Sequence, residues 1–236
     1  STRKSHIRKY SKYLQKVIKQ NLQEYSFRNI EKVLANYEID SDELKSISKI
    51  LDVEYSKIQI VEHTFFHCSG ITCKITKNKV EYSEAFAGSG EFAVIKIVHE
   101  ILRAKDKTLI LLDEPEVSLH PGAQERFMSF IIEQTKLKKL QFVIATHSPI
   151  LIKNLPNESI KTLSVNKATN QVKINDLGCS PEEAFFHIGF STDNKIRFIV
   201  EDRLAQLMVQ HSIQGLDAAQ KHLFKIEYYN GGAFDI

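Results

Sequence analysis

The chain has 236 residues, of which 42% are hydrophobic and 26% charged, a composition typical of a soluble protein with one large domain or slightly more. Its net charge of +3 is too small to indicate nucleic-acid binding by the chain as a whole, and no apolar run approaches the about 20 residues of a membrane span. The three cysteines, Cys68, Cys73 and Cys179, lack metal-site spacing and cannot all pair, so we expect buried thiols in a reducing, cytoplasmic compartment.

Residues 1–55 are predicted to form a helical arm. Apolar residues at helical spacing predict a first helix over 3–25, and the opposite face of that helix is basic. The basic face fits either a solvated surface or a stripe that contacts a phosphate backbone. A second helix is predicted over 26–36, and a third begins at Asp40, where Glu43 three residues later indicates a capping box.

The pattern changes over residues 56–83, where short apolar or alternating runs between turns predict a β-meander. We interpret His63 and His67 within it as ordinary strand histidines. The sequence Ala-Gly-Ser-Gly-Glu then occupies 87–91 and opens an apolar helix that ends near residue 104. A glycine-rich turn at a helix start exposes backbone N–H groups, so this turn is a candidate phosphate site.

A predicted buried strand over 108–112 delivers two adjacent carboxylates, Asp113 and Glu114, directly before the helix-breaking Pro115. Two ionised carboxylates at the end of an apolar strand are costly to desolvate and need a compensating partner. Hydrated Mg²⁺ is such a partner, because it combines one or two carboxylates with phosphate oxygens. The pair therefore indicates phosphoryl transfer, with one acid near the metal and the other orienting water. The alternative is a strand that ends in a charged turn.

Strands and helices alternate after this point. A helix over 122–136 and a second buried strand over 141–145 follow, and the second strand leads to His147. Alternation of this kind predicts a parallel α/β sheet, in which ligands bind at the carboxyl ends of the strands. The two acids and His147 are therefore expected at one site. A hairpin over 161–174 is predicted at the sheet edge.

Residues 179–195 are interpreted as a junction before a new α/β segment. This segment carries, in order, a strand over 196–200 that ends in Glu201, a helix over 203–213, a strand over 224–228 and the pair Gly231-Gly232.

The order of glycine-rich turn, strand with Asp-Glu and strand with histidine resembles the C-terminal half of an ABC-type ATPase over residues 56–178. The counterparts of its motifs are Ala87–Glu91 for the signature loop, Leu109–Glu114 for the Walker B strand, Ser118–Pro121 for the D-loop and His147 for the switch histidine. The resemblance implies an α/β fold in which a parallel sheet with helices and a β-meander make up half of an ABC-type ATPase.

The same resemblance implies roles for the site residues. Asp113 would hold Mg²⁺, Glu114 would polarise the attacking water and His147 would sense the γ-phosphate. The signature loop would contact ATP bound to the opposite subunit of a head-to-tail dimer or higher oligomer, with the D-loop at the seam. The implied ATP-binding residues are Asp113, Gly88, Ser89, Gly90, Glu91, Ser118 and His120, and the implied catalytic residues are Glu114 and His147. Transporter-type signatures have Leu-Ser where this chain has Ala87-Gly88, so Ser89 is the hydroxyl expected at the phosphate.

The sequence motifs GSGE, DEPEVSLHP and ATHSP resemble those of the overcoming-lysogenization-defect (OLD) nucleases and related anti-phage ATPases. Residues 196–236 resemble the start of a Toprim domain, in which Glu201 would be a metal ligand, although Asp202 stands where that family usually has glycine. This resemblance implies an ATP-gated DNA endonuclease of phage defence, with Mg²⁺ or Mn²⁺ at the nuclease site and a partner protein from the defence system. The alternative is an SMC-like or structural ABC ATPase without nuclease activity.

The phosphate-cradling loop GxxxxGK[ST] is absent, because none of the nine glycines is followed by lysine. We interpret the chain as the C-terminal part of a longer protein, inactive by itself and weak in ATP binding. The alternative is a degenerate ATPase. We prefer the first interpretation, because an inactive site is not expected to retain two strand-end acids and a strand-end histidine together.

Overall fold

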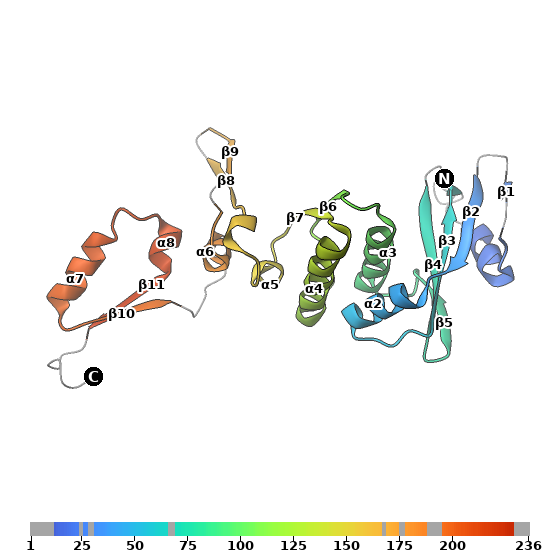
Figure 1. Ribbon diagram of the computed structural model, residues 1–236, viewed down its shortest axis with the longest axis horizontal. Helices are drawn as coiled ribbons and strands as arrows, with labels where there is room; N and C mark the ends of the chain where they lie inside the picture. The colour runs from blue at the N-terminus through green and yellow to red at the C-terminus, as the bar shows by residue number, and fades with distance from the viewer. Residues whose placement is uncertain are drawn as a thin grey trace, which may run out of the picture. The chain divides into compact units, whose positions relative to one another are not determined.

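The computed structural model describes residues 12–23, 26–27, 31–65, 69–166, 169–174, 178–187 and 195–228. It divides into two compact units, Ser1–Thr146 and His147–Ile236. The first contains a five-stranded sheet, a parallel strand pair and helices, and the second contains a hairpin and another parallel strand pair (Figure 1). The α/β class predicted from the sequence is confirmed. The domain boundaries drawn from the sequence stay predictions.

An antiparallel sheet forms much of the first unit. Its strands are neighbours in sequence order (Figure 1): β1 (Ser26–Phe27), β2 (Glu31–Glu38), β3 (Lys57–His63), β4 (Gly70–Lys77) and β5 (Val80–Ser83). The longest pairing joins β3 and β4, from Lys57 opposite Thr76 to His63 opposite Gly70. The predicted meander is therefore confirmed.

The helix predicted over 26–36 is wrong, because its described residues lie in β1 and β2. Strand β2 pairs with β3, and a bulge between Val33 and Ala35 shifts the register. A bulge adds one residue to a strand, so the apolar positions lose their strict alternation and imitate helical spacing. Pairing with the buried strand β3 outweighs that local pattern.

A helix over residues 12–20 packs on this sheet. Its Val17 is fully buried in a cluster with Val33 of β2 and Val61 of β3. The amphipathic helix predicted over 3–25 is confirmed for this part, while residues 1–11 and 24–25 lie outside the described residues. Its basic side is exposed at Lys12, Lys16 and Lys19.

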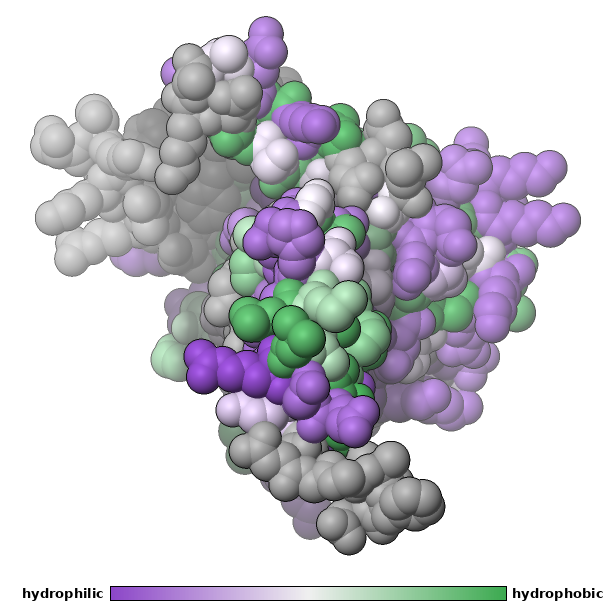
Figure 2. All heavy atoms as spheres, turned by 90° about the vertical axis from the view of Figure 1, so that its left-hand side faces the viewer, coloured by the Kyte–Doolittle hydropathy of each residue, from purple (hydrophilic) through white to green (hydrophobic). Residues whose placement is uncertain are grey.

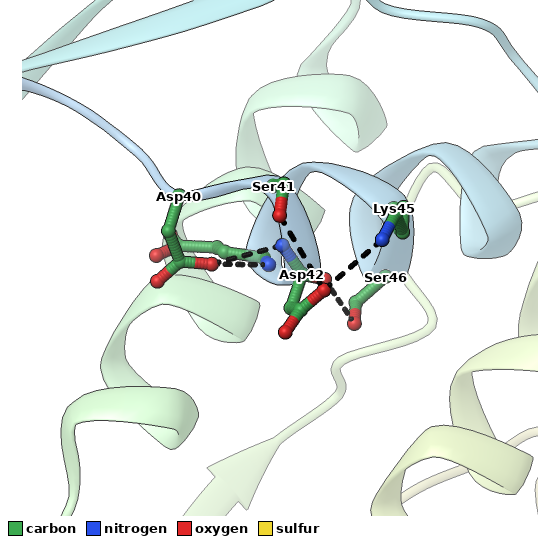
Figure 3. A network of polar contacts seen from close by, with 6 residues as sticks. Asp40, Ser41, Asp42, Lys45 and Ser46 are labelled. Carbon is green, nitrogen blue, oxygen red and sulfur yellow. Dashed lines mark hydrogen bonds and ion pairs between the residues drawn. The ribbon is translucent and has the colours of Figure 1, made fainter.

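The helix α2 (Ser41–Leu51) begins where the sequence predicts. The Asp40 carboxylate accepts hydrogen bonds from the backbone N–H groups of Asp42, at 3.0 Å, and Glu43, at 2.8 Å (Figure 3). The Glu43 side chain is buried and contacts Nδ1 of His99 at 2.6 Å. Helix α2 therefore has a side-chain cap from Asp40, but the predicted capping box is wrong, because the Glu43 carboxylate contacts His99 on another helix.

That helix is α3 (Ser89–Arg103), and α4 (Pro121–Lys138) also packs against α2. Between α3 and α4 in the sequence runs β6 (Leu109–Asp113), which pairs in parallel with β7 (Gln141–Ala145) (Figure 1). The predicted helices over 91–104 and 122–136 and the strand pair are confirmed, with ends that differ by at most two residues.

The prediction that β6 and β7 are buried strands is wrong within this chain. The side chains of Leu109, Leu111 and Val143 are 54%, 70% and 59% exposed. Burial alternates along both strands, so among the described residues only one face of this strand pair is covered. An apolar run is typical of strands covered on both faces, but it does not show which layers are present in the chain.

The second unit contains short elements: α5 (Pro149–Ile152), a 3-10 turn (Asn157–Ser159), β8 (Leu163–Asn166), β9 (Gln171–Ile174), α6 (Pro181–His187), β10 (Ile196–Val200), α7 (Arg203–Ser212), α8 (Ala218–His222) and β11 (Phe224–Tyr228). Strands β8 and β9 form the predicted hairpin, but among the described residues they pair only with each other, so their predicted place at the edge of the sheet is wrong. Strand β10 pairs with β11 in parallel, as expected for a strand, helix, strand unit. The predicted Gly231-Gly232 lies outside the described residues. No helix in the described part of the chain is both long and apolar enough to cross a membrane.

Helix α7 keeps apolar side chains at its surface. Leu204, Leu207 and Met208 are 66%, 53% and 64% exposed. Figure 2 shows a patch of apolar side chains on the face turned to the viewer, which is the side where α7 lies in Figure 1. The spacing of three and four residues places these side chains on one face of the helix.

Candidate functional site

The two acids predicted at a phosphate site lie at the carboxyl end of β6. Asp113 is opposite Ala145 of β7, and the N–H of Glu114 donates to the Ala145 carbonyl at 2.9 Å. Both Asp113 and Glu114 are exposed. Glu114 has a φ of +43°, a left-handed backbone that a residue with a side chain seldom adopts. Strained backbone of this kind concentrates at functional sites.

The chain then turns sharply through the segment predicted as a D-loop. The carbonyl of Glu114 accepts from the N–H of Val117 at 3.1 Å, and Ser118 has a φ of +68°. Glu116 in this turn accepts a hydrogen bond from the Thr146 hydroxyl at 2.6 Å. The turn after β6 is therefore joined to the residue after β7. Sequence reasoning missed Glu116 and Thr146, because no local pattern shows that contact.

His147 follows Thr146 directly. It is exposed and is the first residue of the second unit. Its role as a switch histidine stays a prediction.

The glycine-rich turn lies at the start of α3, as predicted. Gly88 is the N-cap residue with an extended backbone, and among the described side chains none caps this end of the helix. Gly88 and Ser89 are exposed, whereas Gly90 is buried. A Cβ on Gly90 would lie 2.3 Å from the carbonyl oxygen of Ser118. The structure therefore brings the glycine-rich turn and the D-loop turn of one chain into direct contact.

Glu91 completes this turn, and its carboxylate binds two tyrosines. Its Oε1 accepts hydrogen bonds from the hydroxyls of Tyr55, at 2.6 Å, and Tyr82, at 2.8 Å. Burial, with the hydrogen bond to Glu91 as the next cause, raises the pKa of both tyrosines. Sequence reasoning missed both tyrosine partners, and the ATP-binding role of Glu91 stays a prediction.

His120 begins α4. Its Nδ1 accepts a hydrogen bond from the N–H of Ala123 at 3.3 Å, and Pro121 occupies the first turn. This N-cap bond uses Nδ1 as an acceptor, so the ring proton is on Nε2 when the histidine is neutral. Ser118 and His120 are both exposed, and their place at a dimer seam stays a prediction.

The second predicted acid site is at the end of β10. Glu201 is exposed directly after this strand, and Asp202 caps α7 by accepting from the N–H of Ala205 at 2.7 Å. No cluster of three or more acids, histidines or cysteines that could hold a metal ion occurs in the part of the chain that the structure describes. The role of Glu201 as a metal ligand stays a prediction.

A parallel strand pair, exposed acids at its carboxyl end and a glycine-rich helix start together define an AAA-type α/β module. The chain belongs to the family described as "AAA domain, putative AbiEii toxin, Type IV TA system", whose model matches residues 4–153.

Curated relatives are similar over shorter stretches. The "Retron Ec83 probable ATPase" of Escherichia coli is 25% identical over 142 residues, which is 55% of this chain and 25% of that protein. The "Retron Vc95 probable ATPase" of Vibrio cholerae serotype O1 biovar El Tor is 24% identical over 127 residues, 49% of this chain and 23% of that protein. "Protein ea59" of Escherichia phage lambda is 33% identical over 69 residues, 29% of this chain and 13% of that protein. The chain thus matches a quarter or less of each relative.

Solved structures with a similar arrangement include heads of SMC ATPases. One, from a study of ATP-driven dimerization and DNA stimulated activation of SMC ATPases, is 16% identical with a TM-score of 0.44 and covers 62% of this chain and 86% of that chain. The Smc head domain with a coiled coil and joint from Pyrococcus yayanosii is 17% identical with a TM-score of 0.45 and covers 62% of this chain and 27% of that chain.

Proposed function

We propose that this chain supplies two parts of an ATPase that hydrolyses ATP between two copies of the protein. These parts are the strand-end acids, Asp113 and Glu114, and the glycine-rich turn Gly88–Gly90, called the signature turn below. The observation that carries the proposal is the position of Glu114. It presents an exposed carboxylate from a left-handed backbone at the carboxyl end of a parallel strand pair, next to Asp113. Membership of an AAA domain family and the likeness to two retron proteins named as probable ATPases support it.

The acids fit the metal that ATP brings. Mg²⁺ keeps several waters and is bound through one or two carboxylates together with phosphate oxygens, so it needs no cluster of three protein ligands. Asp113 would hold the ion, which neutralises phosphate charge when bound. Glu114 accepts a proton from water and orients that water toward the γ-phosphate. His147 is the proposed sensor of the γ-phosphate.

The start of α3 fits the phosphate of a second copy. No described side chain caps this helix end, so its first-turn N–H groups can donate hydrogen bonds to an anion, and the helix dipole favours negative charge there. Ser89 adds an exposed hydroxyl. Two copies arranged head to tail would place the signature turn of each on the ATP held by the other.

The test is Glu114→Gln in the full-length protein. Because the amide keeps the shape but cannot accept a proton, we expect ATP and Mg²⁺ to bind with near-normal affinity while turnover falls by at least about 100-fold. The measurements are steady-state phosphate release and equilibrium binding of ATP.

The matched control is Glu133→Gln, which makes the same chemical change at an exposed position of α4. It should hydrolyse ATP at the wild-type rate. Near-normal turnover of Glu114→Gln would show that this acid does not orient the water, and the proposed function would lose its main support.

A finer form of the proposal is an OLD-like, ATP-gated DNA endonuclease of phage defence. It is supported by the resemblance of residues 196–236 to a Toprim opening and by the exposed Glu201 at the end of a parallel strand. Glu201 would be one ligand of a Mg²⁺ or Mn²⁺ site completed by acids elsewhere in the protein. DNA would be the substrate, and a further protein of the defence system would be a partner.

The alternative is an SMC-like or structural ATPase without a nuclease. It is favoured by Asp202, which stands at the position of a usual glycine and caps α7. Glu201→Ala in the full-length protein separates the two, because loss of metal-dependent DNA cleavage with intact ATP hydrolysis supports the nuclease. No cleavage by the wild-type protein supports the alternative. Unchanged cleavage by Glu201→Ala would remove Glu201 from the proposed metal site.

A further inference from the structure

Two segments of the meander meet the first turn of α3 through one carboxylate. The Glu91 Oε1 accepts from Tyr55, which precedes β3, and from Tyr82, which lies on β5. Tyr55 is buried, with only 5% of its surface exposed. The glycine-rich turn is therefore tied to the sheet at two points, one 36 positions and one nine positions from Glu91.

The chemistry of these bonds makes them firm. Hydrogen bonds from a hydroxyl to a carboxylate are shorter and about twice as strong as bonds between neutral groups. Burial raises the pKa of both tyrosines, so both hydroxyls keep their protons and donate throughout the neutral range. The negative charge of Glu91 is also favourable in the first turn of a helix.

We propose that Tyr55 and Tyr82 are positioning residues that hold the signature turn, Gly88–Gly90, in the orientation that binds the γ-phosphate of a second copy. This inference rests on the proposed function. Glu91 follows the turn directly, so a rotation of the first turn of α3 displaces Ser89 and the first N–H groups together.

The turn also packs against the D-loop turn. Gly90 lies so close to the Ser118 carbonyl that even a Cβ would overlap it. The signature turn is thus in contact with the D-loop turn at Gly90 and bound to the two tyrosines through Glu91. A change at a phosphate-binding turn of this kind alters binding of the second copy more than it alters the chemical step.

The test compares full-length wild-type protein with the double variant Tyr55→Phe, Tyr82→Phe. Rates of ATP hydrolysis are measured at saturating ATP over a series of protein concentrations. The protein concentration that gives half-maximal specific activity should rise by about tenfold, because two charge-assisted bonds are lost. The kcat at saturating protein should stay within about twofold of the wild-type value.

The matched control is Tyr37→Phe. Tyr37 also donates to a carboxylate of the sheet, Glu62 at 2.5 Å, but it contacts α3 at His99, away from the first turn. This variant should lower the melting temperature by a similar amount without moving the half-maximal concentration. An equal shift in the control, or no shift in the double variant, overturns the inference.

Two further measurements keep the outcomes apart. Hydrogen exchange of the amides of residues 92–95 should be faster in the double variant and unchanged in the control, and unchanged exchange in both overturns the inference. If the double variant does not fold, Tyr82→Phe and Glu91→Gln must each shift the half-maximal concentration in the same direction. A wild-type protein that hydrolyses no ATP at any concentration overturns the proposed function and this inference together, whereas an active wild-type protein with an unshifted double variant overturns only the inference.

Discussion

The contact between Gly90 and the D-loop turn can be tested with a single methyl group. In Gly90→Ala the new Cβ would lie 2.3 Å from the Ser118 carbonyl oxygen, 3.0 Å from the Ser118 carbonyl carbon and 3.2 Å from Cδ2 of Leu119. The nearest of these atoms is backbone, so it cannot rotate away as a side chain does. The first turn of α3 and the D-loop turn must therefore separate by about 1 Å, a typical overpacking strain.

The magnitude follows from two opposing effects. Overpacking costs about 1–3 kcal/mol, and exchanging glycine for alanine within a helix returns up to about 1 kcal/mol. Because the overlapped atom is backbone and cannot rotate away, the cost lies in the upper part of its range, and the net loss in free energy of unfolding is about 1–2 kcal/mol. For a domain of this size, that loss lowers the melting temperature by about 2–8 °C.

The matched control is Gly88→Ala, the same substitution two residues earlier. A Cβ on Gly88 would meet no atom within 4 Å, and its φ of −62° suits alanine. Thermal unfolding followed by circular dichroism should show the control within about 1–2 °C of the wild-type chain. If Gly90→Ala melts at the same temperature as Gly88→Ala, the proposed close approach of the two turns is wrong.

Two further predictions concern the scaffold. Asp40→Ala removes the cap of α2 (Figure 3) and should cost about 0.5–2 kcal/mol in chemical denaturation, whereas Asp42→Ala, at a surface ion pair with Lys45, should cost less than about 1 kcal/mol. Burial lowers the pKa of His63 below its ordinary 6.5, so the unfolded chain takes up the proton first and stability should fall as the pH drops through and below about 6.5. His63→Gln should flatten this dependence in melting curves, and an unchanged slope would contradict the assignment.

The elements that the sequence predicts well are those fixed by local chemistry. Asp40 predicts the start of α2 because an N-cap acts only on the next three residues. The ends of β6 and β7 are visible because an apolar run stops at Asp113 in one strand and after Ala145 in the other. These positions follow from a few adjacent residues, and the structure agrees with them.

The predictions that are wrong concern features that depend on residues distant in sequence. Residues 26–36 look helical, yet β2 forms because β3 is available as a partner and because a bulge absorbs the irregular spacing. The exposure of Leu111 and Val143 depends on which layers cover the sheet. Both outcomes are decided by residues far away in sequence, so no window of neighbouring residues contains them.

The candidate site shows the same division within a few ångströms. Groups that we propose to act on a ligand, such as Glu114 and Ser89, stand at element ends and are visible as motifs. Groups that hold them in place are not, because Tyr55 reaches Glu91 across 36 positions of sequence and Thr146 reaches Glu116 across 30. A variant that changes a motif residue tests the chemical step. A variant that changes one of these distant partners tests whether the partner positions the motif residues. Comparing Glu114→Gln with the tyrosine variants therefore separates the chemical step from the assembly of the site.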